Sequence, residues 1–541
     1  MSIFNIEFYL FYGNFLLNIC SIQKPNIIFY LADDLGYGDL SSYGHPTQDE
    51  NVIDFMANHG IKFTSMYSVA TFCTPSRSAI LTGIQPNRYG MNGPSQVHLP
   101  FKNFGLPRDI MTIPKHLQNN NYYTGMIGKW HLGINKYNSS DGYYLPKHYG
   151  FNYVGYNLPF TLNRLCDQEN YYVSKPNNSF SFMYYADDIV EQPIDTKTLT
   201  NRLIDDAINF LYRYLDKTDK KDNFFLYFSF PQPHASIFNN DQFKYTSKRG
   251  RYGDQINEMA YAIEKVESFL KKHELYQNTL RIFSSDHGAD VLLGPQGGNN
   301  GLLREKSQYV SNLKGSKSDY WDGGLRVPFI FYWPKYIKKF QIIRKPFSLL
   351  DIFPTISTII NKKNPEIKHD GKSILKKLTL NFSDLSINNN EDPILFYCHQ
   401  MLIAARYKRF KFYFYNPTGT IAKLFDSMKL NNKTKNTKNE NIKNFHNLNQ
   451  NYIKSCSEMK KLENIKIYDV DNNPSENFAI EMDEYQKNVY LKDIDNFIKK
   501  KEKLFENVNF TLESHIVSKK FIPCCGPDCY SKTFYAKCNI N

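Results

Sequence analysis

Three acidic side chains follow short apolar runs along the chain. Asp33 and Asp34 come just after the run 26–31, and Asp286 comes just after the run 279–285. Each run is short and continuous, which is typical of a buried parallel strand. Ligands of open α/β sheets bind at the carboxyl ends of strands, and carboxylate oxygens suit calcium or magnesium. A helix cap or a solvated turn is the alternative interpretation of an aspartate pair.

A second polar group lies in the segment Gly128–Gly133, which reads G-K-W-H-L-G. Lys129 and His131 alternate, so an extended segment would place both side chains on one side. Two cationic or protonatable groups beside a glycine-flanked backbone suit a small tetrahedral dianion. A core histidine packed beside Trp130 is the alternative.

Cys73 begins the run C-T-P-S-R, which ends at Arg77. A single cysteine is most often a small buried hydrophobe. An arginine on a helix is most often an exposed charge. The five residues alone therefore leave a structural and a chemical interpretation open.

Taken together and in this order, three segments resemble signatures of the sulfatase family. They are C-x-P-x-R at 73–77, G-K-W-H-L-G at 128–133 and G-G-L-R-V-P at 323–328. The resemblance is dense from residue 25 to about 335 and weaker toward the end.

Within that family the chain is most similar to arylsulfatase A and N-acetylgalactosamine-6-sulfatase. The run R-Y-G-D at 251–254 and the tail C-C-G-P-D-C at 524–529 carry this likeness. Steroid sulfatase has a membrane hairpin in mid-chain, whereas 157–200 is polar here. No membrane span is therefore expected.

The resemblance implies that Cys73 is not used as a thiol. A formylglycine-generating enzyme would oxidise it to 3-oxoalanine (formylglycine), which is hydrated to a diol. One hydroxyl would attack sulfur to give a covalent sulfo-enzyme, and the other would later expel sulfate. The implied activity is that of a sulfuric ester hydrolase of the arylsulfatase type, and the substrate class is a sulfated glycan, a glycolipid or an aryl or steroid sulfate.

The resemblance also implies one bound calcium ion. Its ligands would be the side chains at the following positions: Asp33, Asp34, the converted Cys73, Asp286 and His287. Many relatives have asparagine where this chain has His287, and an imidazole is a softer ligand than calcium usually takes.

The remaining implied site residues surround the sulfate. Arg77 would lie against the diol, Lys129 would bind sulfate, and His131 would take the proton that releases it. His234 would contact the ester oxygen and Lys317 would help to protonate the leaving oxygen. On sequence alone, His234 and Lys317 are equally compatible with the surface.

Two assignments near this set stay open. Lys314 lies close enough to Lys317 to compete for its role, and Thr161 aligns loosely with a serine that touches sulfate in arylsulfatase A. Two other functions are alternatives: a phosphatase or phosphodiesterase of the alkaline phosphatase clan, and a non-catalytic binder of sulfated glycans.

Composition restricts the partners. The 541 residues carry a formal net charge of +13, and Lys and Asn are dense throughout. No basic stripe interleaved with aromatics and no nucleic-acid-binding motif is present, so we expect no nucleic acid partner. A homo-oligomer is compatible with the sequence.

Formylglycine is made in the endoplasmic reticulum in animals, so we expect the secretory pathway, with a lysosomal or secreted destination. Residues 1–21 are a candidate signal peptide with an apolar stretch but no basic start. Sequons begin at Asn138, Asn177, Asn381, Asn432 and Asn509. Four of the nine cysteines crowd the tail, which favours disulfides of undetermined connectivity.

The expected fold class is α/β. A large, mixed, mostly parallel sheet would be sandwiched by helices, as in alkaline phosphatase, and a smaller C-terminal domain would contain an antiparallel sheet. We place the catalytic domain at 22–380 and the smaller domain with its Cys-rich tail at 381–541. Predicted elements include strands at 223–230 and 327–334 and helices at 254–273 and 349–360.

Overall fold

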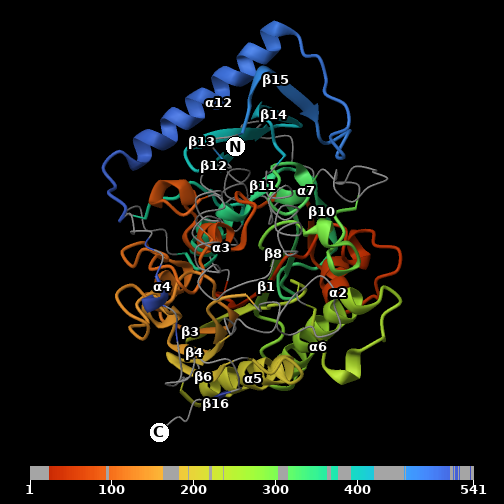
Figure 1. Ribbon diagram of the computed structural model, residues 1–541. Coiled ribbons are helices and arrows are strands. Elements are labelled where there is room, and N and C mark those ends of the chain that lie inside the picture. The colour runs from red at the N-terminus through yellow and green to blue at the C-terminus, as the bar shows by residue number, and fades with distance from the viewer. Residues whose placement is uncertain are drawn as a thin grey trace, which may run out of the picture.

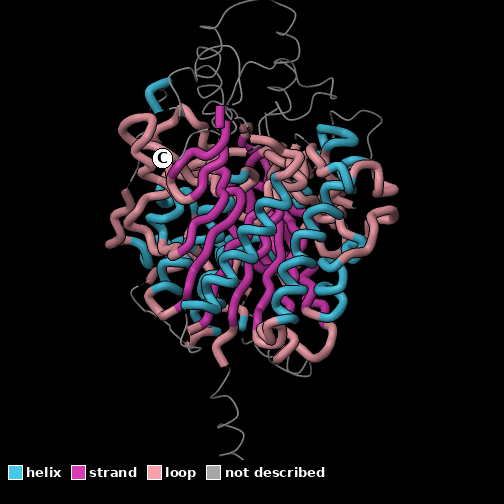
Figure 2. The backbone as a smooth tube through the Cα atoms, turned by 90° about the horizontal axis from the view of Figure 1, so that it is seen from below, coloured by secondary structure: helices cyan, strands magenta, loops and turns pink. Residues whose placement is uncertain are grey.

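The computed structural model contains a large mixed sheet covered by helices on both faces, and a separate small antiparallel sheet (Figures 1 and 2). The structure describes residues 23–92, 97–161, 182–192, 194–217, 222–235, 237–301, 315–361, 367–375, 391–418, 456, 459–511, 516, 518–521, 523 and 536–537.

The strands of the large sheet follow the order β10-β2-β9-β8-β1-β7-β3-β4-β5-β6-β16, with β11 also paired to β2. They are β1 (Asn26–Ala32), β2 (Ile61–Tyr67), β3 (Tyr122–Lys129), β4 (Tyr153–Leu158), β5 (Met183–Tyr185), β6 (Asp188–Gln192), β7 (Asn223–Ser229), β8 (Thr279–Ser285), β9 (Arg326–Tyr332), β10 (Gln341–Ile343), β11 (Phe347–Ser348) and β16 (Ala536–Lys537). The central strands β8, β1, β7, β3 and β4 run parallel to their neighbours in that group. The fold class is confirmed.

Helices α3, α4 and α8 cover one face of the large sheet and α2, α5 and α6 cover the other. The described helices are α2 (Val52–His59), α3 (Cys73–Thr82), α4 (Ile113–Gln118), α5 (Leu199–Lys217), α6 (Arg251–Lys272), α7 (Asp322–Leu325), α8 (Ile352–Ile359) and α12 (Glu484–Phe505). Short 3₁₀ turns cover Ser41–Tyr43, Pro86–Tyr89, Pro146–Tyr149, Asp241–Phe243, Val291–Gln296, Leu349–Asp351 and Lys519–Phe521.

Strand β1 shows why the two layers need a continuous apolar run. Successive strand residues point to opposite faces of a sheet. Ile27 and Phe29 pack in the core under α3, α4 and α8, whereas Ile28 and Tyr30 pack in the core under α2, α5 and α6. All of β1 is buried, as the sequence predicts.

The other predicted elements that fall on described residues are confirmed within a few residues. The strands at 223–230, 279–285 and 327–334 are β7, β8 and β9, and the helix at 254–273 is α6. The predicted helix at 349–360 begins as a 3₁₀ turn and continues as α8.

The small sheet has the order β12-β13-β14-β15 and is antiparallel. Its strands are β12 (Ile394–Cys398), β13 (Met401–Tyr407), β14 (Phe410–Tyr415) and β15 (Lys461–Asp469). Helix α12 runs along it (Figure 1), and a disulfide joins Cys398 to Cys456.

The two sheets are linked by buried charges. Lys411 of β14 lies 2.7 Å from Asp322 of α7 and 3.6 Å from Glu476, and all three side chains are buried. The last strand, β16, returns to the large sheet beside β6. The boundary near residue 381 stays a prediction.

Several expectations concern residues outside the described ones: the candidate signal peptide at 1–21, the tail cysteines at 524–529 and the sequons at Asn177, Asn381 and Asn432. Among the described residues, no helix is both long and apolar enough to cross a membrane.

Candidate functional site

The acidic cluster is formed by neighbouring parallel strands. β1 and β8 pair in register up to Ala32 and Ser285, so Asp33 and Asp286 leave the sheet side by side. One oxygen of each of Asp33, Asp34 and Asp286 lies within 4.8 Å of the others, and all three residues are buried. The three carboxylates therefore converge at the carboxyl edge of the sheet, where the sequence predicts that a ligand binds.

Asp39, which the sequence interpretation missed, holds the loop that carries two of these aspartates. Its carboxylate accepts hydrogen bonds from the Gly36 N–H at 2.6 Å and the Tyr252 hydroxyl at 2.9 Å. Arg249 and the Asn299 N–H donate to its other oxygen. Asp39 is completely buried.

The same loop has a backbone turn at Asp34, whose φ is 59°. This left-handed conformation costs roughly 1 to 3 kcal/mol for a residue other than glycine. The Tyr252 hydroxyl lies 3.3 Å from the Asp34 carbonyl oxygen, and a Cβ on Gly36 would lie 2.5 Å from the Asn299 carbonyl oxygen. Asp39 and its partners therefore fix the turn that aims Asp34 into the cluster.

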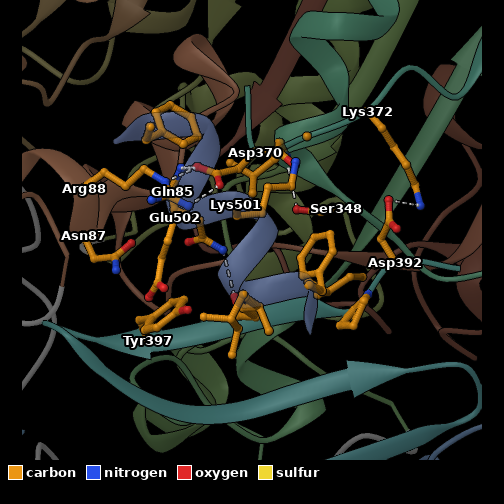
Figure 3. Close-up of a pocket in the computed structure, with 18 of the residues that line it drawn as sticks. Gln85, Asn87, Arg88, Ser348, Asp370, Lys372, Asp392, Tyr397, Lys501 and Glu502 are labelled. Carbon is orange, nitrogen blue, oxygen red and sulfur yellow. Dashed lines mark hydrogen bonds and ion pairs between the residues drawn. The ribbon is translucent and has the colours of Figure 1, made fainter. Parts of the chain in front are cut away.

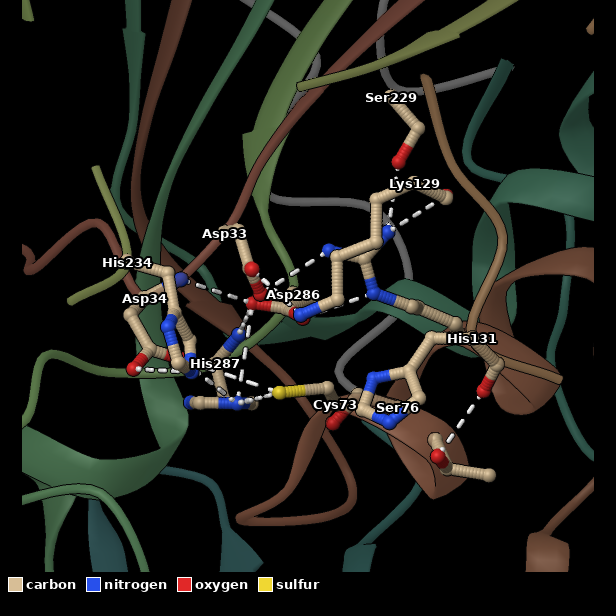
Figure 4. A network of polar contacts seen from close by, with 12 residues as sticks. Asp33, Asp34, Cys73, Ser76, Lys129, His131, Ser229, His234, Asp286 and His287 are labelled. Atoms are coloured by element: carbon tan, nitrogen blue, oxygen red, sulfur yellow. Dashed lines mark hydrogen bonds and ion pairs between the residues drawn. The ribbon is translucent and has the colours of Figure 1, made fainter. Parts of the chain in front are cut away.

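Cys73 is the first residue of α3 and faces the acidic cluster (Figure 4). Its Sγ lies 3.3 Å from Nε2 of His287 and 3.9 Å from Oδ1 of Asp34. It is 4% exposed. The amino end of a helix favours negative charge, which suits an oxyanion at this position.

Arg77 lies one turn further along α3 and is fully buried, so the exposed-charge alternative is wrong. Its Nε donates to Asp286 at 3.0 Å and its Nη2 donates to Asp33 at 3.1 Å. Its Nη1 donates to Ser229 Oγ at 2.6 Å, and no sequence pattern predicts this partner. Burial opposes the charge of Arg77, but Asp286 and Asp33 outweigh it and raise its pKa.

Lys129 ends β3, and its Nζ is paired with Oδ2 of Asp33. Burial alone would raise the pKa of Asp33, yet Lys129, with help from other cations, holds that pKa well below its ordinary value.

The prediction of one extended segment through His131 was wrong, because His131 has a φ of 57° and the chain turns there. His131 is buried, and burial beside Lys129 and Arg77 holds its pKa well below the ordinary value.

Lys317 and His234 form the other side of the site. The Lys317 Nζ lies 2.8 and 2.6 Å from the two carboxylate oxygens of Asp34 and 3.2 Å from Nε2 of His234. Thr161 Oγ1 lies 3.3 Å from Nδ1 of His234. Lys314, the competing lysine, is outside the described residues.

The two groups differ in charge. Burial lowers the pKa of His234 to about 4, so the ring is neutral. Burial also opposes the charge of Lys317, but Asp34 outweighs it and raises the lysine pKa well above its ordinary value.

The residues fit a hard cation. Three buried carboxylates converge, and His287 Nε2 lies 3.3 Å from Asp34 Oδ1 and 3.8 Å from Asp286 Oδ1. Burial disfavours a charged His287, but Asp286, Cys73 and Asp34 outweigh burial and raise its pKa to about 9. A bound cation would compete with that proton, because a metal ligand must be neutral imidazole.

A cavity of about 380 Å³ lies elsewhere, between α12, the 3₁₀ turn Pro86–Tyr89 and the segment around Asp370 (Figure 3). Arg88 pairs with Asp370 at 2.7 Å, and Lys501 donates to the Asp370 carbonyl at 2.6 Å. The cavity shares no residue with the acidic cluster.

The acidic cluster lies at the carboxyl edge of the sheet, and Arg77, Lys129 and Lys317 pair with its carboxylates. This arrangement of carboxylates and cations suits a tetrahedral oxyanion next to a metal cation. The fold and the site thus define a hydrolase class that acts on esters of such oxyanions. The comparisons with known proteins specify it further.

A family model described as Sulfatase matches residues 25–362. The chain is 38% identical over 397 residues to "Arylsulfatase" of Hemicentrotus pulcherrimus, covering 73% of this chain and 68% of that protein. It is 33% identical over 463 residues to "Steryl-sulfatase" of Rattus norvegicus, covering 73% and 76%.

Solved structures agree with the fold. Ps i-CgsB superposes with a TM-score of 0.65 and 25% identity, over 91% of this chain and 95% of that one. The PsFucS1 sulfatase from Pseudoalteromonas sp. has a TM-score of 0.69 and 21% identity, over 93% and 96%, and supports the fold alone. The chain belongs to the sulfatase family and is a sulfatase hydrolase.

Proposed function

We propose that this chain hydrolyses sulfate esters through a hydrated formylglycine made from Cys73, beside one calcium ion. The observation that carries the proposal is the position of Cys73. It begins a helix, its Sγ lies 3.3 Å from His287, and it faces the acidic cluster that Arg77 ties together. Asp33, Asp34, Asp286, His287 and position 73 would hold the calcium, which supplies charge stabilisation for the sulfate oxygens.

The protein side chains have distinct tasks in this proposal. Lys129 binds a sulfate oxygen, and Lys317 with His234 delivers a proton to the leaving alcohol oxygen as the S–O bond breaks. The 3.2 Å contact between these two groups supports a shared proton on that side.

Release of sulfate takes place on the opposite side, at His131. This ring takes the proton of the remaining hydroxyl on residue 73. The C–O bond to sulfate then breaks, its electron pair leaves with sulfate, and the carbonyl double bond re-forms from the O–H pair. Water adds back to the carbonyl to restore the diol.

The proposal also includes passage through the secretory pathway, because the thiol must be oxidised by a formylglycine-generating enzyme. The disulfide between Cys398 and Cys456 is consistent with an oxidising compartment.

The test is hydrolysis of p-nitrophenyl sulfate by protein secreted from eukaryotic cells, compared with its Cys73→Ala variant. We expect turnover in the parent only, and a peptide mass that shows aldehyde at position 73. The Cys73→Ala variant loses only the Sγ atom, and thermal unfolding of both proteins checks that the variant is folded despite the small cavity at this buried position. Equal turnover in both proteins would refute the proposed nucleophile.

A further inference from the structure

The hydroxyl of Thr74 connects three segments around the nucleophile position. Thr74 follows Cys73 in α3 and is fully buried. Its Oγ1 accepts the N–H of His98 at 3.0 Å and donates to the carbonyl of His131 at 2.9 Å. A hydroxyl has one donor and two acceptor sites, so it satisfies both contacts at once.

The ring of His131 is oriented from the same place. Its Nε2 lies 3.1 Å from the carbonyl oxygen of His98. A carbonyl only accepts, so Nε2 carries the hydrogen, and in a neutral imidazole Nδ1 is then the nitrogen with the free lone pair. That Nδ1 is buried and has no hydrogen-bond partner among the residues that the structure describes.

His98, whose carbonyl selects this tautomer, is itself held by two hydrogen bonds. The N–H of His98 is bound to Thr74, and its ring Nδ1 lies 3.0 Å from the carbonyl of Phe104, to which it donates. A buried nitrogen without a partner costs roughly 1 to 3 kcal/mol, as does the left-handed backbone of His131. The contacts from Thr74 and His98 therefore hold His131 in a conformation whose left-handed backbone and bare Nδ1 are each unfavourable by themselves.

We propose that Thr74 and His98 are positioning residues: the Thr74 hydroxyl and the His98 carbonyl hold the His131 ring in the tautomer whose Nδ1 carries no hydrogen. This inference rests on the proposed function, in which His131 takes the proton that accompanies sulfate release. It assigns a task to the residue between Cys73 and Pro75, which is not fixed in the C-x-P-x-R pattern.

Thr74→Val removes the hydroxyl at nearly constant volume, whereas Thr74→Ser retains it. Misplacing a catalytic group by about 1 Å costs on the order of 100-fold in rate. We expect the valine variant to lose about 10- to 100-fold in kcat with KM within about threefold, and the serine variant to stay within about threefold in both. Rates are normalised to the fraction of formylglycine, measured by peptide mass.

The tautomer can be measured without any turnover. In protein labelled with ¹⁵N histidine and expressed with Cys73 unconverted, two-bond ¹⁵N–¹H correlations distinguish Nε2–H from Nδ1–H. His131→Gln identifies the signal by its loss. We expect Nε2–H in the parent and a mixture of tautomers in Thr74→Val.

An Nδ1–H tautomer in the parent would overturn the inference, even if the valine variant failed to fold. So would a valine variant with unchanged kcat, or one that loses kcat while His131 keeps the parent tautomer, which would indicate a purely structural role. Failure of the proposed function gives a different result: no turnover in the parent, with the tautomer still as expected.

Discussion

Replacement of Asp39 by asparagine should loosen the loop that aims Asp34 into the acidic cluster. Oδ2 of Asp39 accepts from Gly36 and Tyr252, and Oδ1 accepts from Arg249 and the Asn299 N–H. Each oxygen of Asp39 accepts from two donors, whereas asparagine has one oxygen and one NH₂ group. In either orientation of the amide, the NH₂ group therefore faces two donors and can accept from neither. The Arg249 side chain, 10% exposed, also loses its counter-charge.

The size of the effect follows from these contacts. Removing one partner of a buried ion pair costs roughly 3 to 5 kcal/mol, and this figure already includes the hydrogen bonds of the pair. We expect Asp39→Asn to be destabilised by about that amount. Groups that orient metal ligands change metal affinity by about 10- to 100-fold, so the calcium dissociation constant should rise within that range.

The assay is thermal unfolding with calcium and with EGTA, together with calorimetric titration of calcium into the metal-free protein. Asp241→Asn is the matched control, since that side chain is 72% exposed and, among the residues that the structure describes, its ion pair is with the surface residue Lys244. The control should leave stability unchanged within the error of the measurement. Unchanged calcium affinity in Asp39→Asn would show that the loop does not depend on this carboxylate.

Two further predictions concern residues outside the cluster. Burial, helped by Asp322, outweighs Lys411 and raises the pKa of Glu476 from 4.5 to about 7. The stability that the raised pKa contributes is fully present below pH 4.5 and is lost as pH rises through about 7. Glu476→Gln should therefore gain roughly 2 to 3 kcal/mol of stability over the parent between pH 5 and pH 8. Denaturant unfolding of both proteins at pH 5 and pH 8 measures this gain. A stability difference between variant and parent that is equal at the two pH values would contradict the raised pKa of Glu476. Asn138 begins a sequon in an exposed turn, where its Oδ1 accepts from the N–H and the hydroxyl of Ser140. A glycan there should give a mass shift on deglycosylation that Asn138→Gln reduces by one glycan, and an identical shift in both proteins would exclude this site.

The sequence predicted the central sheet well because β1, β7 and β8 are buried on both faces. Such strands must be continuously apolar, and a polar residue where they end is conspicuous. The acidic cluster was predictable for the same reason, since parallel strands bring their carboxyl ends to one edge. Helix α5 was not predicted, although its buried residues Leu203, Ala207 and Phe210 recur at helical spacing and are as clear a signal as the apolar face of α6.

Residues that support the site were harder to find, because their partners are distant in sequence. Asp39 meets Arg249 and Ser229 meets Arg77 only after the sheet has formed, and hydrogen bonds of this kind have no periodicity. The extended segment expected through His131 failed for a related reason. Alternation in sequence describes a strand, but β3 ends at Lys129, and contacts from Thr74 and His98 determine the turn that follows.

The arrangement explains why one short helix carries so much of the site. Cys73, Thr74 and Arg77 lie within the first turn and a half of α3, and each contacts a different loop: His287, the turn at His131 and the two aspartates at the sheet edge. A shift of this helix would therefore move the proposed nucleophile, the proposed base and the acidic cluster relative to one another. Substitutions at Thr74 should accordingly change kcat more than KM, because they disturb alignment between groups and leave the cations Arg77 and Lys129 in place.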